Sequence, residues 1–308
     1  MIDFTGLPKK NKAYAGANGS KISVVYEGEQ YMLKFPPHLS KNENMSYSNS
    51  CISEYLGCRI FESVGIPVQQ TMLGTYITEK GGERVVVACK DFTSVGIVLQ
   101  DFASLKNQII DSERNGYGTD LDDIVSVFFE QTAVEPEEIS GRFWDMFIVD
   151  ALIGNWDRHN GNWGFLYDVR EDSMTLAPVF DCGSSLFPQA DEEMIKNILA
   201  DKREIHHRIF NIPLSAIQKN GKKINYFEFI SSLENEGCND ALERILPRID
   251  MEKIAGIIDE TPAISDVQKE FYKKMLAARK ERILDYSLQR LHKCINEISI
   301  RCQCGRTE

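Results

Sequence analysis

The sequence predicts an α+β fold with two lobes: a small β-rich N-terminal lobe over residues 1–92 and a larger, mostly helical C-terminal lobe over residues 93–308. Three observations support this prediction. Short β-rich runs and turn residues fill most of the first ninety positions, around one helical period. Helical periods dominate after Phe92, apart from one β-rich island. A chain of 308 residues is also long enough to bury a sizeable core.

The N-terminal lobe is expected to contain two hairpins and one helix. Glu27-Gly28-Glu29 and Lys80-Gly81-Gly82 supply the residue types that turns between strands favour. Gly65-Ile66-Pro67 places a glycine before a proline, the order that ends a helix. The expected elements are strands at residues 21–26 and 30–35, a helix at 48–64, and strands at 71–77 and 83–89.

The C-terminal lobe is expected to be helical around a single hairpin. The expected helices cover residues 101–110, 121–131, 141–154, 191–209, 226–233 and 266–298. The last of these carries an apolar stripe, which we interpret as a core face because amphipathic helices usually bury one side. The β-rich island consists of Trp163–Tyr167 and Thr175–Phe180, joined by a polar turn.

Composition restricts the classes of function. The net charge of -11 disfavours a general nucleic-acid binder and docking on anionic lipid, so we expect no direct nucleic-acid partner and no membrane partner. No apolar run approaches the roughly 18 residues of a membrane span, and the N-terminus lacks the apolar segment of a signal peptide. The eight cysteines are scattered without a CxxC pair, which is typical of reduced thiols. We therefore expect a cytoplasmic protein.

Three polar residues flank the predicted island. Asp157 stands five residues before Asn162, and Asp181 follows nineteen residues after Asn162. Because an antiparallel hairpin brings its two ends together, Asn162 and Asp181 should be neighbours. Phosphoryl transfer needs one carboxylate that orients a hydroxyl, together with an amide and a second carboxylate that hold Mg²⁺. Helix capping and turn formation are the alternative roles of these residue types.

The N-terminal lobe offers groups that could hold ATP. Lys34 in the second strand could reach the α- and β-phosphates, and Glu54 on the following helix could pair with it. Small residues before the first strand would let backbone N–H groups approach phosphate oxygens. A plain turn and solvent-facing charges are the alternatives. The predicted nucleotide contacts are Gly16, Ala17, Asn18, Gly19, Ser20, Lys21, Lys34, Cys89, Lys90, Asp91, Phe92 and His159.

With these residues placed, the chain resembles the HipA-like kinases, which are bacterial serine/threonine kinases with a two-lobed, protein-kinase-like fold. AGANGSK resembles the phosphate loop, YMLKFP the lysine strand, and SEYLGCRIFESVGI the helix with the glutamate. NWDRHNGN resembles the catalytic loop and APVFDCGSSL the metal-binding segment, and all five pieces stand in family order. For His159, orienting this loop is the structural alternative to a chemical role.

The sequence departs from the family at several positions. Gly161 stands where members often have a lysine just before the metal-binding Asn. Ala13 aligns with the serine that the toxin kinases autophosphorylate, and Ser20 and Ser23 are nearby alternatives. Because Lys34 comes so early, we expect the small N-terminal domain of the toxin kinases to be missing. The chain thus looks more like the short, stand-alone members of the family.

The resemblance implies an ATP- and Mg²⁺-dependent kinase whose acceptor is serine or threonine of a protein substrate. Asp157, Lys34 and Glu54 would act in catalysis, and Asn162 and Asp181 would hold the metal. Two alternatives stay open. DRHNGN also resembles the catalytic loop of phosphatidylinositol kinases, which act on lipid, and a nucleotide-binding pseudokinase would act as a regulatory module. The sequence also leaves open an antitoxin-like or regulatory partner.

Overall fold

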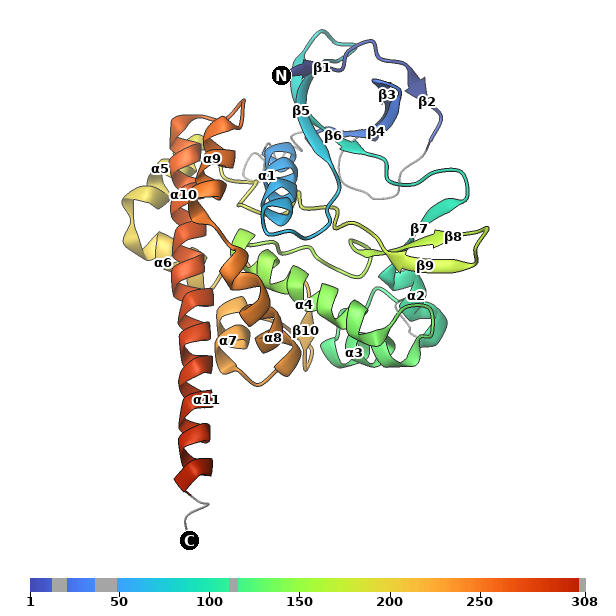
Figure 1. The fold of residues 1–308 in the computed structure, drawn as a ribbon. Helices are drawn as coiled ribbons and strands as arrows, with labels where there is room; N and C mark the ends of the chain where they lie inside the picture. Colours follow the sequence, from blue (N-terminus) through green and yellow to red (C-terminus); the bar gives the residue numbers. More distant parts are fainter. Residues whose placement is uncertain (13–20, 37–48, 111–115, 305–308) are drawn as a thin grey trace.

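The computed structural model describes residues 1–12, 21–36, 49–110 and 116–304, with side chains up to residue 297. Figure 1 shows a β-rich part at the top, a helical part below it, and a C-terminal helix that extends away from the body. The predicted two-lobed α+β architecture is confirmed. A division between the lobes after residue 92 stays a prediction.

A six-stranded sheet forms the N-terminal lobe, in the order β1-β5-β6-β4-β3-β2. Both predicted hairpins are present and antiparallel. Gly28 and Gly81 in their turns have φ of 82° and 79°, a conformation that favours glycine. The strands are β1 (Ile2–Asp3), β2 (Lys9–Lys10), β3 (Lys21–Tyr26), β4 (Glu29–Lys34), β5 (Thr71–Ile77) and β6 (Glu83–Lys90). The unpredicted strands β1 and β2 are too short to show an alternating pattern.

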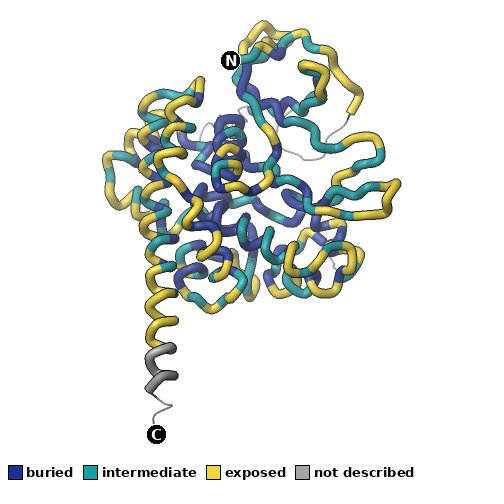
Figure 2. The backbone as a smooth tube through the Cα atoms, in the orientation of Figure 1, coloured by how far each residue is buried: buried dark blue, intermediate teal, exposed yellow. Residues whose placement is uncertain are grey.

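Helix α1 (Ser50–Ser63) packs between this sheet and the helical lobe. Ile52, Leu56 and Ile60 recur every four residues and are buried, so the helical period that predicted α1 is its core face. Gly65, with φ of 79°, follows the helix end as predicted. Figure 2 shows that buried backbone is concentrated where α1 meets the helical part.

Helices build most of the C-terminal lobe. They are α2 (Phe102–Ile109), α3 (Leu121–Glu130), α4 (Pro136–Ile153), α5 (Glu192–Ala200), α6 (Lys202–Phe210), α7 (Tyr226–Ser232), α8 (Glu236–Ile245), α9 (Met251–Glu260), α10 (Asp266–Arg279) and α11 (Tyr286–Cys304). Every residue from Met146 to Ile153 in α4 is buried, so this helix is enclosed by the lobe. Helices α8 and α9 were missed by the sequence analysis.

Three helix predictions need correction. The predicted helix 191–209 is split at Asp201, whose carboxylate caps α6 by accepting the backbone N–H of Arg203 at 2.8 Å. The predicted helix 266–298 contains a π-helical segment, Lys280–Asp285, between α10 and α11. Helix α4 begins at Pro136, five residues before the predicted start at 141, because proline suits the first turn of a helix. Interruptions this short barely disturb a hydrophobic period.

Two small sheets complete the lobe. The predicted island is present as β8 (Gly164–Asp168) and β9 (Ser173–Leu176), and the unpredicted β7 (Ile97–Asp101) pairs antiparallel with β8. The second strand was predicted to run to Phe180, but it ends at Leu176, and Val179 forms a bridge with Val68 instead. Strands β10 (Gln218–Lys219) and β11 (Lys222–Lys223) form a short second hairpin. The helical lobe therefore contains one three-stranded and one two-stranded sheet besides its helices.

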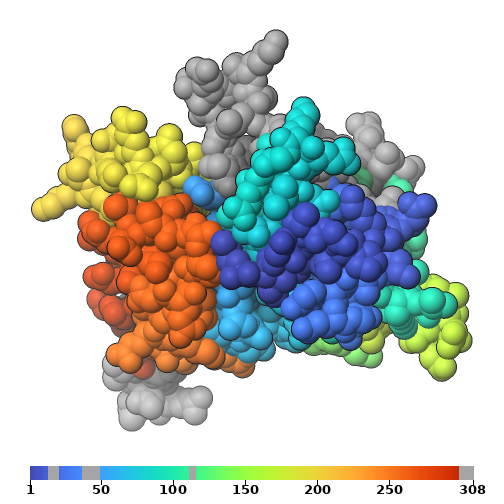
Figure 3. All heavy atoms as spheres, turned by 90° about the horizontal axis from the view of Figure 1, so that it is seen from above, coloured from blue at the N-terminus to red at the C-terminus, as the bar shows by residue number. Residues whose placement is uncertain are grey.

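The two lobes are in contact through main-chain hydrogen bonds and through one lysine side chain. Val68 forms a β-bridge with Val179, and the N–H of Gln69 donates to the Val179 carbonyl at 2.8 Å. On the other side of α1, the Lys253 ammonium of α9 donates to the Ser63 carbonyl. Seen from above, the surface of α9 and α10 borders the N-terminal strands (Figure 3). Among the helices in the described ranges, none has the length and apolar character of a bilayer span.

Candidate active site

Lys34 lies at the centre of a network of three charged residues. It ends β4, and its neighbour Leu33 is fully buried on the opposite face of the strand. Its Nζ lies 2.9 Å from Oε2 of Glu54 on α1 and 2.9 Å from Oδ1 of Asp181. The predicted pair of Lys34 and Glu54 is therefore present. The structure adds a direct contact between this pair and Asp181.

Asp157 and Asn162 lie in the loop that follows α4. The helix ends at Gly154, in the left-handed conformation with φ of 65°. The Oδ1 of Asn155 then accepts the backbone N–H of Asp157 at 3.0 Å. Asn162 closes the loop, because its Nδ2 donates to the Asp157 carbonyl at 2.7 Å. The loop thus folds back on itself and holds Asp157 beside Asn162.

A buried arginine joins this loop to the Asp181 segment. The Arg158 Nη1 donates to the Asn162 carbonyl at 2.9 Å and also to the carbonyl of Phe180. Its Nε lies 3.0 Å from Oδ2 of Asp150 on α4. One guanidinium therefore binds the chain just before β8 and the segment that ends at Asp181, so that Asn162 and Asp181 are neighbours.

Asp181 has a backbone conformation that is uncommon for a residue with a side chain. Its φ is 59°, and such conformations cost about 1–3 kcal/mol outside glycine. At Gly183 a Cβ would lie 3.1 Å from Oε2 of Glu54, and at Gly57 a Cβ would lie 2.6 Å from the Cβ of Cys182. Glycine at both positions lets α1 come close to this segment.

The environments of the two carboxylates separate their pKa values. Burial raises the pKa of Asp157, and the charge of Asp181 adds to this rise while His159 opposes it. Burial acts in the same direction on Asp181, but Lys34, Lys21 and Arg158 together outweigh it and lower the pKa of Asp181 to about 2. Asp181 is therefore ionised at neutral pH, whereas Asp157 is the more basic of the two. Carboxylates separated in this way commonly divide metal binding from proton handling.

The donor set beside Asp157 suits Mg²⁺. The Nδ2 of Asn162 is used within the loop, which leaves its Oδ1 for a ligand. The Asp181 side chain is 38% exposed, so one face is open although Oδ1 contacts Lys34. Within the described ranges, no group of three or more His, Cys, Asp and Glu side chains could hold a metal. Two oxygen ligands completed by phosphates and water is the arrangement in which Mg²⁺ is usually bound.

The predicted nucleotide contacts have different outcomes. Gly16, Ala17, Asn18, Gly19 and Ser20 lie outside the described residues. Lys21 begins β3 directly opposite Lys34, and burial followed by the charge of Lys34 lowers its pKa. These two lysines place positive charge at the end of the hairpin that faces Asp181.

The segment after β6 is largely occupied by protein contacts. Cys89 is fully buried, and the N–H groups of Lys90 and Asp91 donate to the carbonyls of Gln70 and Gln30 at 2.8 Å. The ring of Phe92 lies 5.8 Å from that of Phe180, the residue before Asp181. A nucleotide contact by this segment stays a prediction, and its backbone N–H groups at 90 and 91 are already used.

His159 has a structural position in the loop. The backbone N–H of His159 donates to the Asp157 carbonyl at 2.8 Å, and its ring Nδ1 accepts the backbone N–H of Gly161 at 3.0 Å. Its ring packs edge-on against Tyr117. These contacts agree with the structural alternative for His159, while its prediction as a nucleotide contact stays untested.

Sequence reasoning missed the residues that hold the site in place. Asp150, Asn155, Arg158 and Asn160 are all buried, and none was a candidate. Asn160 Nδ2 donates to the carbonyls of Gly116 and Gly118 at 2.8 Å, which ties the loop to the chain after α2. A usable signal was present, since Asp150 interrupts the apolar run from Phe147 to Ile153. A charge on an enclosed helix needs a partner.

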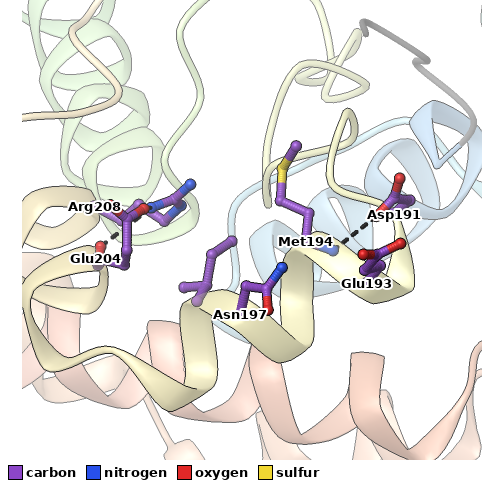
Figure 4. A pocket seen from close by; sticks show the side chains of 7 residues that line it. Asp191, Glu193, Met194, Asn197, Glu204 and Arg208 are labelled. Carbon is purple, nitrogen blue, oxygen red and sulfur yellow. Dashed lines mark hydrogen bonds and ion pairs between the residues drawn. The ribbon is translucent and has the colours of Figure 1, made fainter. Parts of the chain in front are cut away.

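A separate hollow of about 310 Å³ lies between α5 and α6, and Figure 4 shows its side chains. Glu204 and Arg208 form an ion pair on one side of it, and the N–H of Met194 donates to Asp191 on the other. None of the predicted site residues lines it. The hollow is therefore distinct from the candidate active site.

The fold and the site together define a kinase. A β-rich lobe carries a lysine paired with a helix glutamate, and a helical lobe presents an Asp, an Asn and a second Asp against that lysine.

Comparison with known proteins agrees with this class. The model of the HipA-like C-terminal domain matches residues 11–271. The serine/threonine-protein kinase CtkA of Helicobacter pylori is 48% identical over 286 residues, which cover 92% of this chain and 86% of CtkA. The crystal structure of a Helicobacter pylori proinflammatory kinase CtkA has a TM-score of 0.89 at 47% identity, and covers 95% of this chain and 98% of that one.

The chain belongs to the HipA-like C-terminal domain family. The predicted family, the protein-kinase-like fold and the class of serine/threonine-protein kinase are confirmed. HipA of Shewanella oneidensis MR-1, solved with HipB and operator DNA, has a TM-score of 0.53 at 18% identity, and covers 92% of this chain and 68% of that one. At that identity the match supports the shared fold alone.

Proposed function

We propose that this serine/threonine kinase transfers the γ-phosphate of ATP, bound with Mg²⁺ between the two lobes, to hydroxyl groups of a protein substrate. The observation that carries the proposal is the contact of Lys34 with both Glu54 and Asp181, each at 2.9 Å. This contact joins the lysine strand, the helix glutamate and the second Asp in one network. Phosphoryl transfer requires all three in place.

Each residue has a role that follows from its surroundings. Lys34 would bind nucleotide phosphates, and Glu54 and Asp181 keep it charged, because together they hold its pKa well above the usual range in spite of burial. Asn162 and Asp181 would hold Mg²⁺, which neutralises phosphate charge when it is bound. Asp157 would orient the acceptor hydroxyl and accept its proton, a task that its raised pKa favours.

The direct test is transfer of labelled γ-phosphate from ATP to the protein itself and to a general protein substrate, followed by mass spectrometry of the labelled residue. We expect Mg²⁺-dependent labelling of serine or threonine, and loss of labelling in Asp157→Ala. Asp240→Ala is a matched control, because Asp240 is an exposed carboxylate on α8. Equal labelling by the wild type and Asp157→Ala would contradict the role of Asp157.

Two experiments test the alternatives. Labelling of phosphoinositide vesicles without labelling of protein in the same assay would decide for a lipid kinase. ATP binding in calorimetry without any transfer would decide for a pseudokinase. A cytoplasmic location and a regulatory protein partner stay predictions, which fractionation and pull-down experiments would test.

A further inference from the structure

The β10–β11 hairpin is attached to the loop that carries Asp157. The N–H of Gln218 donates to the Thr119 carbonyl at 2.8 Å, just after Tyr117, which packs against His159. At the other end of the hairpin, the Tyr226 hydroxyl donates to the Asn155 carbonyl at 2.6 Å. The hairpin is therefore fixed at both ends to the surroundings of Asp157.

This hairpin carries three lysines on an otherwise acidic protein. Lys219, Lys222 and Lys223 flank the turn Asn220-Gly221, in which both residues have positive φ as a tight hairpin turn requires. Lys222 and Lys223 are exposed, and Lys219 lies over the ring of Phe229. Across the described part of the chain, no ion pair within 4 Å involves these lysines.

The register of the hairpin distinguishes Lys223 from the other two lysines. Lys219 and Lys222 are paired across the strands and share one face, on which Lys219 lies over Phe229. Lys223 is paired with Gln218 and lies on the opposite face. Lys223 also stands three residues before Tyr226, which contacts Asn155, two residues before Asp157. The anchoring of the hairpin thus attaches Lys223 to the loop that carries Asp157.

The loop itself does not supply a lysine at this point. Position 161 is glycine, and a Cβ there would lie 3.0 Å from the Tyr117 ring and 3.1 Å from the His159 ring. A longer side chain would therefore have to displace both rings. Lys223, which comes from a different part of the chain, places a cation on the hairpin attached to this loop without entering that space.

We propose that Lys223 binds a carboxylate or phosphate group that lies next to the acceptor serine or threonine of the protein substrate. The acceptor hydroxyl must come within about 3 Å of Asp157 for proton transfer. Neighbouring residues of an extended acceptor then lie about 3–7 Å along the chain, within reach of a flexible lysine. The inference rests on the proposed function, because it names the substrate class of that same site.

The test compares peptide libraries in which a central serine is flanked by one fixed residue at each position in turn. The fixed residue is aspartate, phosphoserine, alanine or lysine, and initial rates with labelled ATP and Mg²⁺ give the preference at each position. We expect about a threefold preference for aspartate or phosphoserine over alanine at one or two positions, since the contact is exposed. The preferred peptides should have a lower KM and an unchanged kcat, because the contact contributes to peptide binding.

Variants then assign the preference to the hairpin. Lys223→Met should remove it, and Lys223→Glu should reverse it in favour of lysine. Lys80→Glu is the matched control, because Lys80 is exposed in the turn between β5 and β6 and makes the same change of charge. It should keep the wild-type preference. A merely structural role of Lys223 would change overall rates and leave the ratio between peptides unmoved.

The outcomes separate the inference from the function on which it rests. Phosphorylation of peptides without an acidic preference, or a preference that survives Lys223→Glu, would overturn the inference alone. Failure to phosphorylate any peptide or protein would overturn the proposed function and the inference with it. A preference confined to phosphoserine would identify phosphorylated proteins, and one shared with aspartate would identify acidic segments, as the bound class.

Discussion

Two ionic networks meet at the candidate active site, and they differ in exposure. The Asp150 and Arg158 side chains are 1% and 5% exposed, and the guanidinium is enclosed by backbone carbonyls. In the other network Glu54 is 1% exposed, Lys34 14% and Asp181 38%. One network is thus closed on all sides, whereas the other begins in the core and ends at the surface.

The difference separates two tasks. A closed network cannot exchange partners, so the Asp150–Arg158 pair can only position the segments around it. In the network of Lys34 the exposure increases from Glu54 to Asp181. Glu54 fixes the buried end, whereas Asp181 at the exposed end can exchange its contact with Lys34 for a metal ion. We therefore expect substitutions in the closed network to change stability first, and substitutions at the open end to change activity first.

The largest effect on stability is expected for Arg158→Met. Removing the guanidinium leaves Asp150 as an unpaired charge in the core, which typically costs about 3–5 kcal/mol of unfolding free energy. Urea unfolding followed by circular dichroism would measure this loss. Arg59→Met is the matched control, because Arg59 pairs with Glu62 at the surface with 43% of its side chain exposed. A loss below about 1 kcal/mol for Arg158→Met would contradict the comparison.

Asp181→Asn should lower the kinase activity much more than the stability, the opposite of what we expect for Arg158→Met. The amide is a poorer metal ligand than the carboxylate, so the kinase rate should fall by about 10²-fold or more. Stability should fall by only about 1 kcal/mol, because Lys34 keeps Glu54 and solvent screens the exposed end. Steady-state kinetics with varied Mg²⁺ and urea unfolding of the same preparation would measure both. A large loss of stability with normal metal dependence would place Asp181 in the structural network instead.

Glu54→Gln is expected to have an intermediate effect. Lys34 would keep its contact with Asp181 but lose the fixed partner on α1, so we expect a rate lower by about tenfold. The KM for ATP should rise, since the lysine no longer has one defined position. Binding of a fluorescent ATP analogue would measure the change. An unchanged KM with a lower rate would show that Glu54 acts through α1 packing rather than through Lys34.

The smallest effect is expected for a surface pair. Lys273 and Asp259 are 2.7 Å apart, with 38% and 52% of their side chains exposed. Lys273→Met should change the unfolding free energy by no more than about 0.5 kcal/mol, because water and salt screen such pairs. This measurement gives the change in unfolding free energy that is expected when a fully solvent-screened ion pair is removed. A change as large as that of Arg158→Met would mean that exposure does not separate these networks.

The sequence predicted the placement of the candidate site residues better than it predicted the residues that hold them. Lys34 and Glu54 could be paired because a strand and the next helix are neighbours in the chain. Asn162 and Asp181 were paired because a hairpin joins its own ends. The structure bears out both placements, but it brings Asn162 and Asp181 together through Arg158, since β9 ends five residues before Asp181.

Other features depend on contacts that no local pattern contains. Arg158 directly follows Asp157, and its burial becomes visible only when α4 places Asp150 beneath it. The left-handed backbone at Asp181 lies where α1 comes close, since a Cβ at Gly57 would lie 2.6 Å from the Cβ of Cys182. The attachment of the β10–β11 hairpin to the Asp157 loop combines segments from three parts of the chain.

The contacts of Arg158 have one more consequence. Its guanidinium grips carbonyl oxygens at Asn162 and Phe180, and every amino acid has a carbonyl oxygen. The grip therefore makes no demand on the side chains at those positions. Asn162 can direct its amide oxygen toward a ligand while its carbonyl stays bound to Arg158. Asp181, which follows Phe180, can direct its carboxylate toward the same ligand in the same way. The enzyme could in this way alter its chemistry by changing side chains while the arginine went on holding the same main chain.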